Sequence, residues 1–374
     1  MKGRIDTKIG AQTAEQLRRL DSNLAPLWDL GRNMVAAWTA DGKALRLLIV
    51  DFYRLLRIAE THPAILRGSL YRMAVEFAEL QTLLAVEPLE IHCEFRVGSR
   101  SDEVQWKNVE RVIRRYAIRE STSRAVILLD IVGFSKLTSI QRIAQLNSLE
   151  YSINITQRLL HQNGLKVDLA RSTTGDGFYI WNREKGPMGN IALFIVLVFI
   201  LADNALCNTK DTQSFVPLLR AAFSIGSHLS YHQIEGLLPR GYDYIVGDVT
   251  ISLARLIEKA PPKQILIGEF KAEWADEAGV IGTVEFIRRT QRLIGKFTGM
   301  NLGNAPISGF KLSLDTAAGA VGNAAGGGKA SSLAPRKIMI TDKHGIGHEA
   351  YAVRAEIERA GAFPLYLGVA LAPA

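Results

Sequence analysis

Two aspartates stand where strand-like runs turn at glycine, and they form the most informative chemical pattern in the chain. Asp130 ends the apolar run 125–129, and Asp176 stands between Gly175 and Gly177. An apolar run bounded by glycine predicts a buried strand, and glycine allows a tight turn that a ligand can approach closely. Two carboxylates on neighbouring strands suit Mg²⁺ or Mn²⁺ beside a polyphosphate, which indicates two-metal phosphoryl chemistry. The same residues also suit a helix N-cap and a hairpin turn, so spacing alone leaves both interpretations open.

A third segment favours the chemical interpretation. Gly247 and Asp248 precede a helix-like run that contains Arg255, and an apolar run follows at residues 263–268. The three segments resemble the signatures of the class III nucleotidyl cyclases, which are a DIxGF strand end, a GDG hairpin and a GD…AR helix start. They occur in the family's order, and the resemblance covers residues 119–313. It implies a ferredoxin-like α/β (α+β) domain related to the polymerase palm, and a head-to-tail homodimer with two shared sites.

The resemblance assigns roles to the matching positions. It implies that Asp130 and Asp176 bind Mg²⁺ or Mn²⁺, two ions per site, with the backbone carbonyl of Ile131 as a third donor. Arg255 matches the arginine that contacts the α-phosphate in the transition state, and in the family this arginine and the aspartates come from opposite subunits. A guanidinium keeps its charge and offers a donor fork that suits phosphate. The alternative is an exposed helix arginine.

Further substrate contacts are expected around the triphosphate. The backbone N–H groups of residues 132–135, which include Phe134 and Ser135, are predicted to cradle phosphates at the start of the following helix. Lys296 is a candidate for the terminal phosphates, with an exposed loop lysine as the alternative. The implied reaction is attack of the ribose 3′-oxygen on the α-phosphorus with release of pyrophosphate. This reaction needs the charge that grows on the phosphoryl group to be neutralised.

Three positions depart from the family pattern and bear on the substrate. Ser172 stands where adenylate cyclases have lysine and guanylate cyclases have glutamate, and Tyr244 stands where the family has aspartate or cysteine. Ile251 replaces the second transition-state residue, an asparagine, and Ser252 beside it is the candidate substitute. Serine cannot supply the ionic partner that distinguishes adenine from guanine. Tyrosine fills the volume of a purine's second ring and offers a hydroxyl that donates or accepts.

These changes favour a smaller base and resemble the Pycsar pyrimidine cyclases, which are bacterial antiphage enzymes of the same family. The expected function is a uridylate cyclase that makes 3′,5′-cyclic UMP for a downstream cyclic-nucleotide-binding effector protein, with UTP favoured over CTP on overall likeness. Arg171 suits uracil O4, but side chains alternate along a strand, so we expect it to point away from Ser172. The alternatives are a cytidylate or adenylate cyclase, or a degenerate domain that binds nucleotide without catalysis.

The composition is typical of a soluble globular protein. The 374 residues are 48% hydrophobic and 22% charged, which predicts about two domains with a large core. No secretory signal is evident and two cysteines give no disulfide framework, so a cytoplasmic location is expected. The longest apolar stretch, 191–202, is shorter than the about 20 residues that span a bilayer, which predicts a buried helix and no stable membrane insertion. The net charge is +8, but the basic clusters lack an aromatic platform, which favours a solvated face over nucleic-acid binding.

The chain is predicted to contain four segments. Residues 1–118 are expected to form a helical interaction or regulatory domain, with helices at 44–59, 69–84 and 102–116. The catalytic domain is expected at 119–315, a Gly/Ala-rich linker at 316–336, and a small strand-rich extension at 337–374. His344 and His348 in this extension suggest a metal site, but no cysteine or acidic partner stands at ligand spacing, so an ordinary turn is favoured.

Within the catalytic domain, apolar patterning predicts alternating strands and helices with an intervening hairpin. The expected strands are 124–131, 166–174, 178–182, 218–231, 242–246 and 264–267, and the expected helices are 140–161, 191–202 and 249–259. This order is typical of a ferredoxin-like α/β sandwich.

Overall fold

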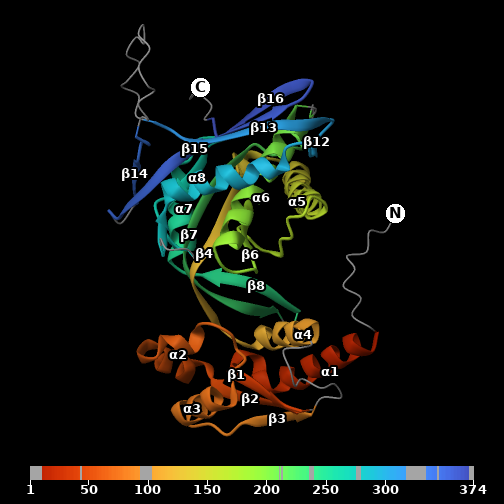
Figure 1. The fold of residues 1–374 in the computed structure, drawn as a ribbon, viewed down its shortest axis with the longest axis vertical. Coiled ribbons are helices and arrows are strands. Elements are labelled where there is room, and N and C mark those ends of the chain that lie inside the picture. Colours follow the sequence, from red (N-terminus) through yellow and green to blue (C-terminus); the bar gives the residue numbers. More distant parts are fainter. Residues whose placement is uncertain are drawn as a thin grey trace. The chain divides into compact units, whose positions relative to one another are not determined.

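The computed structural model describes residues 11–42, 44–92, 103–209, 211, 214–235, 240–274, 279–316, 334–342 and 345–369 (Figure 1). The chain divides into two compact units, which we call the N-terminal unit (Met1–Ser121 with Leu229–Ile245) and the main unit (Thr122–His228 with Val246–Ala374). The break after Ser121 lies close to the boundary expected after residue 118. Residues 229–245 were expected in the catalytic domain, but they group with the N-terminal unit.

The N-terminal unit combines helices with an antiparallel sheet that was not expected. Its antiparallel strands are β1 (Asn33–Asp41), β2 (Ala44–Asp51) and β3 (Leu89–His92), and its helices are α1 (Ala11–Trp28), α2 (Phe52–Thr61), α3 (Ala74–Leu84) and α4 (Glu103–Ile113). The helix expected at 44–59 is therefore wrong over β2. Leu45 and Leu47 pack into one hydrophobic cluster, whereas Leu48 and Val50 pack into another. A strand that is buried on both faces is apolar throughout, and periodicity does not separate such a run from a buried helix.

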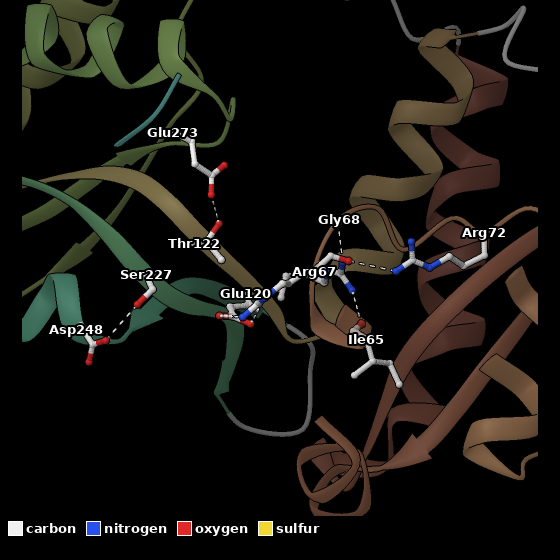
Figure 2. Close-up of polar contacts among 10 residues, drawn as sticks. Ile65, Arg67, Gly68, Arg72, Glu120, Thr122, Ser227, Asp248 and Glu273 are labelled. Atoms are coloured by element: carbon white, nitrogen blue, oxygen red, sulfur yellow. Dashed lines mark hydrogen bonds and ion pairs between the residues drawn. The ribbon is translucent and has the colours of Figure 1, made fainter. Parts of the chain in front are cut away.

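The strand β4 (Arg119–Ile131) begins in the N-terminal unit, where polar contacts hold its first residues. Arg119 donates to the backbone carbonyls of Ile65 at 3.1 Å and Gly68 at 2.6 Å. Next to it, Glu120 pairs with Arg67 at 2.9 Å (Figure 2). These contacts fix the start of the strand whose other end carries Asp130.

The main unit is a mixed α/β fold built on one sheet, in the order β12–β13–β15–β9–β7–β4–β6–β5 (Figure 1). The strands on this path, besides β4, are β5 (Leu169–Thr173), β6 (Gly177–Asn182), β7 (Leu219–Glu235), β9 (Ile265–Gly268), β12 (Asn301–Leu302), β13 (Ala305–Leu314) and β15 (Gly347–Arg359). In addition, β8 (Arg240–Val246) pairs with β7, β14 (Ile338–Thr341) and β16 (Ala362–Leu367) pair with β15, and β10 (Lys271–Glu273) pairs with β11 (Val280–Gly282). β4 and β6 are antiparallel, whereas β7 and β9 are parallel.

Helices cover both faces of this sheet, as the alternation of side chains along β7 shows. On one face Phe223 packs edge-on against Phe194 of α6 (Pro187–Asn208), with the ring centroids 5.0 Å apart. On the other face Gly226 lies against α7 (Asp248–Lys259), where an added Cβ would come within 3.1 Å of the Cβ of Val249. The helices α5 (Ser139–Gln162) and α8 (Thr283–Ile294) pack on the α6 side. The small residues of β7 therefore allow α7 to lie close to the sheet.

The long apolar helix α6 is a core element. It has 22 residues, so the prediction from residues 191–202 that it is too short to span a bilayer is wrong. Among the described residues it is the one helix long and apolar enough to cross a membrane, yet 72% of its most apolar window is buried inside the protein. Helices in the cores of water-soluble proteins pass the same test of length and composition.

The strands after the Gly/Ala-rich segment belong to the main sheet. Strands were expected at 337–342, 349–355 and 364–371, and β14, β15 and β16 occupy these places. They do not form a separate appendix, because β15 lies between β9 and β13 and pairs with both. The end of the chain therefore completes the centre of the fold.

Candidate functional site

Asp130 and Asp176 are brought together by the β4–β6 pairing. Asp130 lies opposite Gly177 in the antiparallel register, and the N–H of Ile131 donates to the backbone carbonyl of Asp176 at 3.0 Å. Only glycine fits at position 177, because an added Cβ would lie 1.9 Å from the carbonyl oxygen of Leu129. The two carboxylates are thus positioned by backbone contacts, as the sequence pattern predicts.

A cation within the protein already contacts one of these carboxylates. The Nε of Arg220 on β7 lies 2.6 Å from Oδ2 of Asp130, and the same guanidinium donates to the carbonyl of Ala260 at 3.2 Å. Burial raises the pKa of Asp130, the hydrogen bond and charge of Arg220 lower it, and the charge of Asp176 raises it, with a net upward shift. Sequence reasoning missed Arg220, although a basic residue at the start of an apolar strand was a signal that could have found it.

The turn after β4 differs from the predicted phosphate cradle. The N–H of Val132 is already bonded to the carbonyl of Leu218 at 2.9 Å, so this group of the predicted set is occupied. Phe134 and Ser135 lie in a short 3₁₀ turn rather than at the start of a helix, and their carbonyls accept hydrogen bonds from Arg142 at 3.2 and 2.8 Å. The turn is therefore held from its carbonyl side by α5.

The helix α5 begins later, at Ser139, and extends to Gln162, which confirms the helix predicted at 140–161. Thr138 is its N-cap, with the side-chain oxygen accepting from the N–H of Gln141 at 3.3 Å.

The third motif forms the start of α7. An added Cβ on Gly247 would come within 2.6 Å of Cα of His228, so only glycine allows the helix to begin against β7. Ser227 donates to the carboxylate of Asp248 at 3.2 Å (Figure 2). An acidic residue in the first turn also interacts favourably with the helix dipole. The motif therefore fixes where α7 begins and the direction in which it leaves the sheet.

The predicted reactive residues of α7 share one face of the helix. Arg255 follows Ser252 by three residues and Ile251 by four, which places the three side chains on one face of the helix. Ile251 is 54% exposed, and Ser252 and Arg255 are half-buried. The guanidinium of Arg255 lies 3.5 Å from Asp342 and 4.0 Å from Glu258. Asp342 follows β14, far along the chain from α7, and sequence reasoning missed it.

The residues expected to contact the base lie in different units. Ser172 is on β5 of the main unit, whereas Tyr244 is on β8 of the N-terminal unit, where its ring packs on Tyr231 with centroids 5.5 Å apart. Neither unit alone contains both. Arg171 points toward α5, where its guanidinium donates to Asn154 at 3.4 Å, which agrees with the prediction that it faces away from Ser172.

Lys296 does not join the other predicted residues. It is exposed in the turn after α8, next to Phe297, whose ring packs on Phe199 of α6 with centroids 5.7 Å apart. This turn therefore belongs to the α6 side of the sheet. In the part of the chain that the structure describes, no contact links Lys296 to Asp130 or Asp176.

The donor set of the aspartate pair fits a hard divalent cation. Asp130 and Asp176 supply carboxylate oxygens, which Mg²⁺ and Mn²⁺ prefer, and their mutual repulsion is relieved by a cation. Over the described ranges, no group of three or more histidine, cysteine, aspartate or glutamate side chains is placed to hold a metal. His344 lies outside the described residues, and Nε2 of His348 is 3.6 Å from Asp342.

Comparison with known proteins gives likenesses among solved structures. No protein-family model matches the chain, and no curated protein matches it. The chain is similar to the guanylate cyclase domain of RhGC from Catenaria anguillulae in complex with GTP, at 14% identity over 63% of this chain and 97% of that one, with a TM-score of 0.38. It is also similar to the guanylyl cyclase Cya2, at 11% identity over 67% of this chain and 98% of that one, with a TM-score of 0.36. A third similar structure is the adenylyl cyclase CyaB from P. aeruginosa, at 12% identity over 63% of this chain and 95% of that one, with a TM-score of 0.37. Identities this low do not transfer an activity from one protein to another.

Proposed function

We propose that this protein is a nucleotidyl cyclase of the class III type, which converts a nucleoside triphosphate to a 3′,5′-cyclic nucleotide and pyrophosphate. The observation that carries the proposal is the pairing of β4 with β6, which places Asp130 opposite Gly177. In this pairing the N–H of Ile131 donates to the backbone carbonyl of Asp176. This arrangement concentrates two carboxylates at one strand end. The order of the three sequence motifs supports the same activity.

Asp130, Asp176 and the carbonyl of Ile131 would hold the Mg²⁺ or Mn²⁺ ions. A bound divalent ion lowers the proton affinity of the ribose 3′-hydroxyl and neutralises charge on the phosphates. Arg220 keeps Oδ2 of Asp130 in place and leaves Oδ1 for coordination. Arg255 would contact the α-phosphate, where its fixed charge stabilises the oxygens on which negative charge grows. Ser252 would take the place of the missing asparagine.

The proposed active site is shared between two chains of a homodimer. The two aspartates of one chain would meet Arg255 of the other, so each dimer has two sites. A mixture of Asp130→Asn and Arg255→Ala proteins tests this arrangement, because a heterodimer then retains one intact site. After random subunit exchange we expect about a quarter of the wild-type activity. If exchange is demonstrated and the mixture remains inactive, the shared site is wrong.

We propose a pyrimidine triphosphate as the substrate, with UTP favoured over CTP. The support is chemical: Ser172 offers no charged partner to a purine, and a tyrosine at position 244 would fill volume that a second ring needs. An unpaired purine edge in a closed site is costly, which adds polar discrimination to the steric effect. Tyr244→Ala should admit ATP or GTP while total turnover falls, and Tyr231→Ala is a control that removes the neighbouring ring.

The proposed product, cyclic UMP, would act as a cytoplasmic second messenger in antiphage defence and would be read by a separate cyclic-nucleotide-binding effector. The competing function is a domain that binds nucleotide without catalysis. Retention of Asp130, Asp176 and Arg255 favours an enzyme, because two close carboxylates repel each other and serve no purpose in an inactive site. Ile251 in place of the family's asparagine favours the non-catalytic domain, but this argument is weaker than the retention of the three charged residues.

The direct test of activity is incubation of the purified protein with each ribonucleoside triphosphate and Mn²⁺, with pyrophosphate release followed over time. Release that stops on addition of a chelator and is absent in Asp176→Asn supports metal-dependent cyclisation. Nucleotide binding without pyrophosphate release would favour the non-catalytic domain.

A further inference from the structure

The arginine proposed to stabilise the transition state is held by a carboxylate from a distant part of the chain. Oδ2 of Asp342, in the turn after β14, lies 3.5 Å from Nε of Arg255 on α7. The Asp342 side chain is only 4% exposed, whereas that of Arg255 is 25% exposed. Both residues belong to the main unit. A buried carboxylate that faces a partly exposed guanidinium orients it strongly, because little solvent screens the pair.

Hydrogen bonds to Ile346 and Gly345 hold Asp342 in place. Oδ1 of Asp342 accepts a hydrogen bond from the N–H of Ile346 at 3.0 Å, and its own N–H donates to the Ile346 carbonyl at 3.0 Å. The N–H of Gly345 donates to the Asp342 carbonyl at 3.1 Å. Oδ1 therefore contacts the N–H of Ile346, whereas Oδ2 is the oxygen nearest Arg255 and lies 3.6 Å from Nε2 of His348.

The strand before this turn is anchored at its opposite end as well. Lys337, just before β14, lies 2.9 Å from Glu349 on β15 and 3.7 Å from Glu269 after β9. A pocket of about 310 Å³, partly open to solvent, is lined by residues of β14 and by Lys259, Gln264 and Leu266. The pairing of β14 with β15 along its whole length, together with these polar contacts, places Asp342 at the end of the strand.

The contact uses the inner nitrogen of the guanidinium. Asp342 approaches Nε as an ion pair, since Nε has no hydrogen-bond partner among the described residues, whereas the terminal nitrogen Nη1 lies 4.0 Å from Glu258, which is 61% exposed. A carboxylate ion-paired at Nε favours one orientation of the guanidinium and lies away from its terminal N–H groups. This is the arrangement that a phosphate-binding arginine requires, because its donor fork acts through fixed geometry.

We infer that Asp342 is a positioning residue, which holds the Arg255 guanidinium in the orientation that contacts the α-phosphate. The inference rests on the proposed role of Arg255 in catalysis. It also gives the strands after the Gly/Ala-rich segment an indirect part in the reaction. Asp342 itself touches no substrate, and its effect passes entirely through Arg255.

The test compares Asp342→Asn with Glu258→Gln, a matched control that neutralises the other carboxylate near the same guanidinium. We expect Asp342→Asn to lower kcat on the order of tenfold with KM changed less than about twofold, as for a misplaced catalytic group. Glu258→Gln should leave both constants unchanged. Asp342→Glu, which retains the charge, should recover part of kcat and guards against loss of folding in the asparagine variant.

A double-mutant cycle tests whether the loss of kcat in Asp342→Asn acts through Arg255. In an Arg255→Ala background, Asp342→Asn should cause no further loss, because the group that it positions is absent. A further tenfold loss in that background, or wild-type kcat in Asp342→Asn alone, overturns the inference.

A spectroscopic readout separates this inference from the proposed activity. In ¹H–¹⁵N spectra the Nε–H signal of Arg255, identified by its loss in Arg255→Lys, should resist exchange with water in the wild type and in Glu258→Gln. Asp342→Asn should make that signal exchange rapidly. If the wild type forms no cyclic nucleotide, the proposed function fails, yet this measurement still decides whether Asp342 positions Arg255. A signal unchanged in Asp342→Asn overturns the positioning role.

Discussion

The Nε of Arg220 and Oδ2 of Asp130 join β7 to β4 at 2.6 Å, at the position where the proposed metal ligands meet. The side chain of Arg220 is 27% exposed and that of Asp130 is 12% exposed, so water screens the pair only in part. The guanidinium places a positive charge beside the Asp130 carboxylate. The site is therefore partly neutralised before any metal binds, which reduces the repulsion that folding must overcome.

Arg220→Gln should destabilise the main unit and make it more responsive to metal. Removal of the guanidinium leaves the largely buried Asp130 carboxylate without a cation, which should cost about 2 kcal/mol, less than for a fully buried pair. A divalent ion restores the missing charge, so Mn²⁺ should raise the Tm of the variant by more than it raises that of the wild type. Thermal melts with and without Mn²⁺ measure both effects. An equal shift in the two proteins would show that Arg220 does not interact with the metal site.

The two aspartate variants should differ in stability although both lose activity. Asp130→Asn leaves the Arg220 guanidinium without its anion, so we expect a loss of about 1–2 kcal/mol in the free energy of unfolding. Asp176 is half-buried and its carboxylate accepts from Thr174 at 3.2 Å, so Asp176→Asn should change stability little. Urea unfolding and product formation, measured on the same preparations of the two variants, test this expected difference in stability. Substantial turnover by either variant in Mg²⁺ contradicts the metal assignment.

A chain that ends at Thr316 should not fold. It lacks β15, whose residues pair with β9 on one edge and with β13 on the other, so two interior strands lose their partners. Exposed strand edges favour aggregation, and we expect insoluble protein. Circular dichroism of any soluble fraction is the measurement. A monodisperse fragment with native-like melting would show that the last strands are dispensable.

The buried imidazole of His228 should make the protein sensitive to acid. Burial lowers its pKa to about 3, assisted by the charges of Arg124 and Lys185. The unfolded chain binds this proton below about pH 6.5, whereas the folded chain does not, so the free energy of unfolding falls as the pH drops from about 6.5 towards 3. One such group contributes a slope of at most about 1.4 kcal/mol per pH unit.

His228→Leu should flatten the fall in stability between pH 6.5 and 4. Among the described residues neither ring nitrogen of His228 has a hydrogen-bond partner, so replacement by an apolar side chain removes no hydrogen bond. His161→Leu, at the exposed end of α5, is the control and should retain the wild-type slope. Equal slopes in the wild type and His228→Leu would exclude His228 as the source of the acid sensitivity.

Local sequence patterns predicted the elements that position the site, but not the contacts between distant residues. The apolar patterning that predicted α5 at 140–161 is local, and the helix extends from Ser139 to Gln162. The turn at Gly177 was predicted for the same reason. The pairing of Arg220 with Asp130 and of Asp342 with Arg255 depends on which strands become neighbours, and no local pattern contains that information. The β2 strand was missed because burial on both faces removed its period of two.

The most direct test of the account is one reaction that contains the wild-type protein, Mn²⁺ and equimolar ATP, GTP, CTP and UTP, with the products resolved by mass spectrometry. We predict that 3′,5′-cyclic UMP dominates, that cyclic CMP is a minor product, and that the Asp176→Asn protein forms neither. Dominant cyclic AMP or cyclic GMP would refute the pyrimidine preference and leave the cyclase activity standing. If no cyclic nucleotide forms from any of the four, although the protein is folded and metal is present, the proposal of a nucleotidyl cyclase is contradicted.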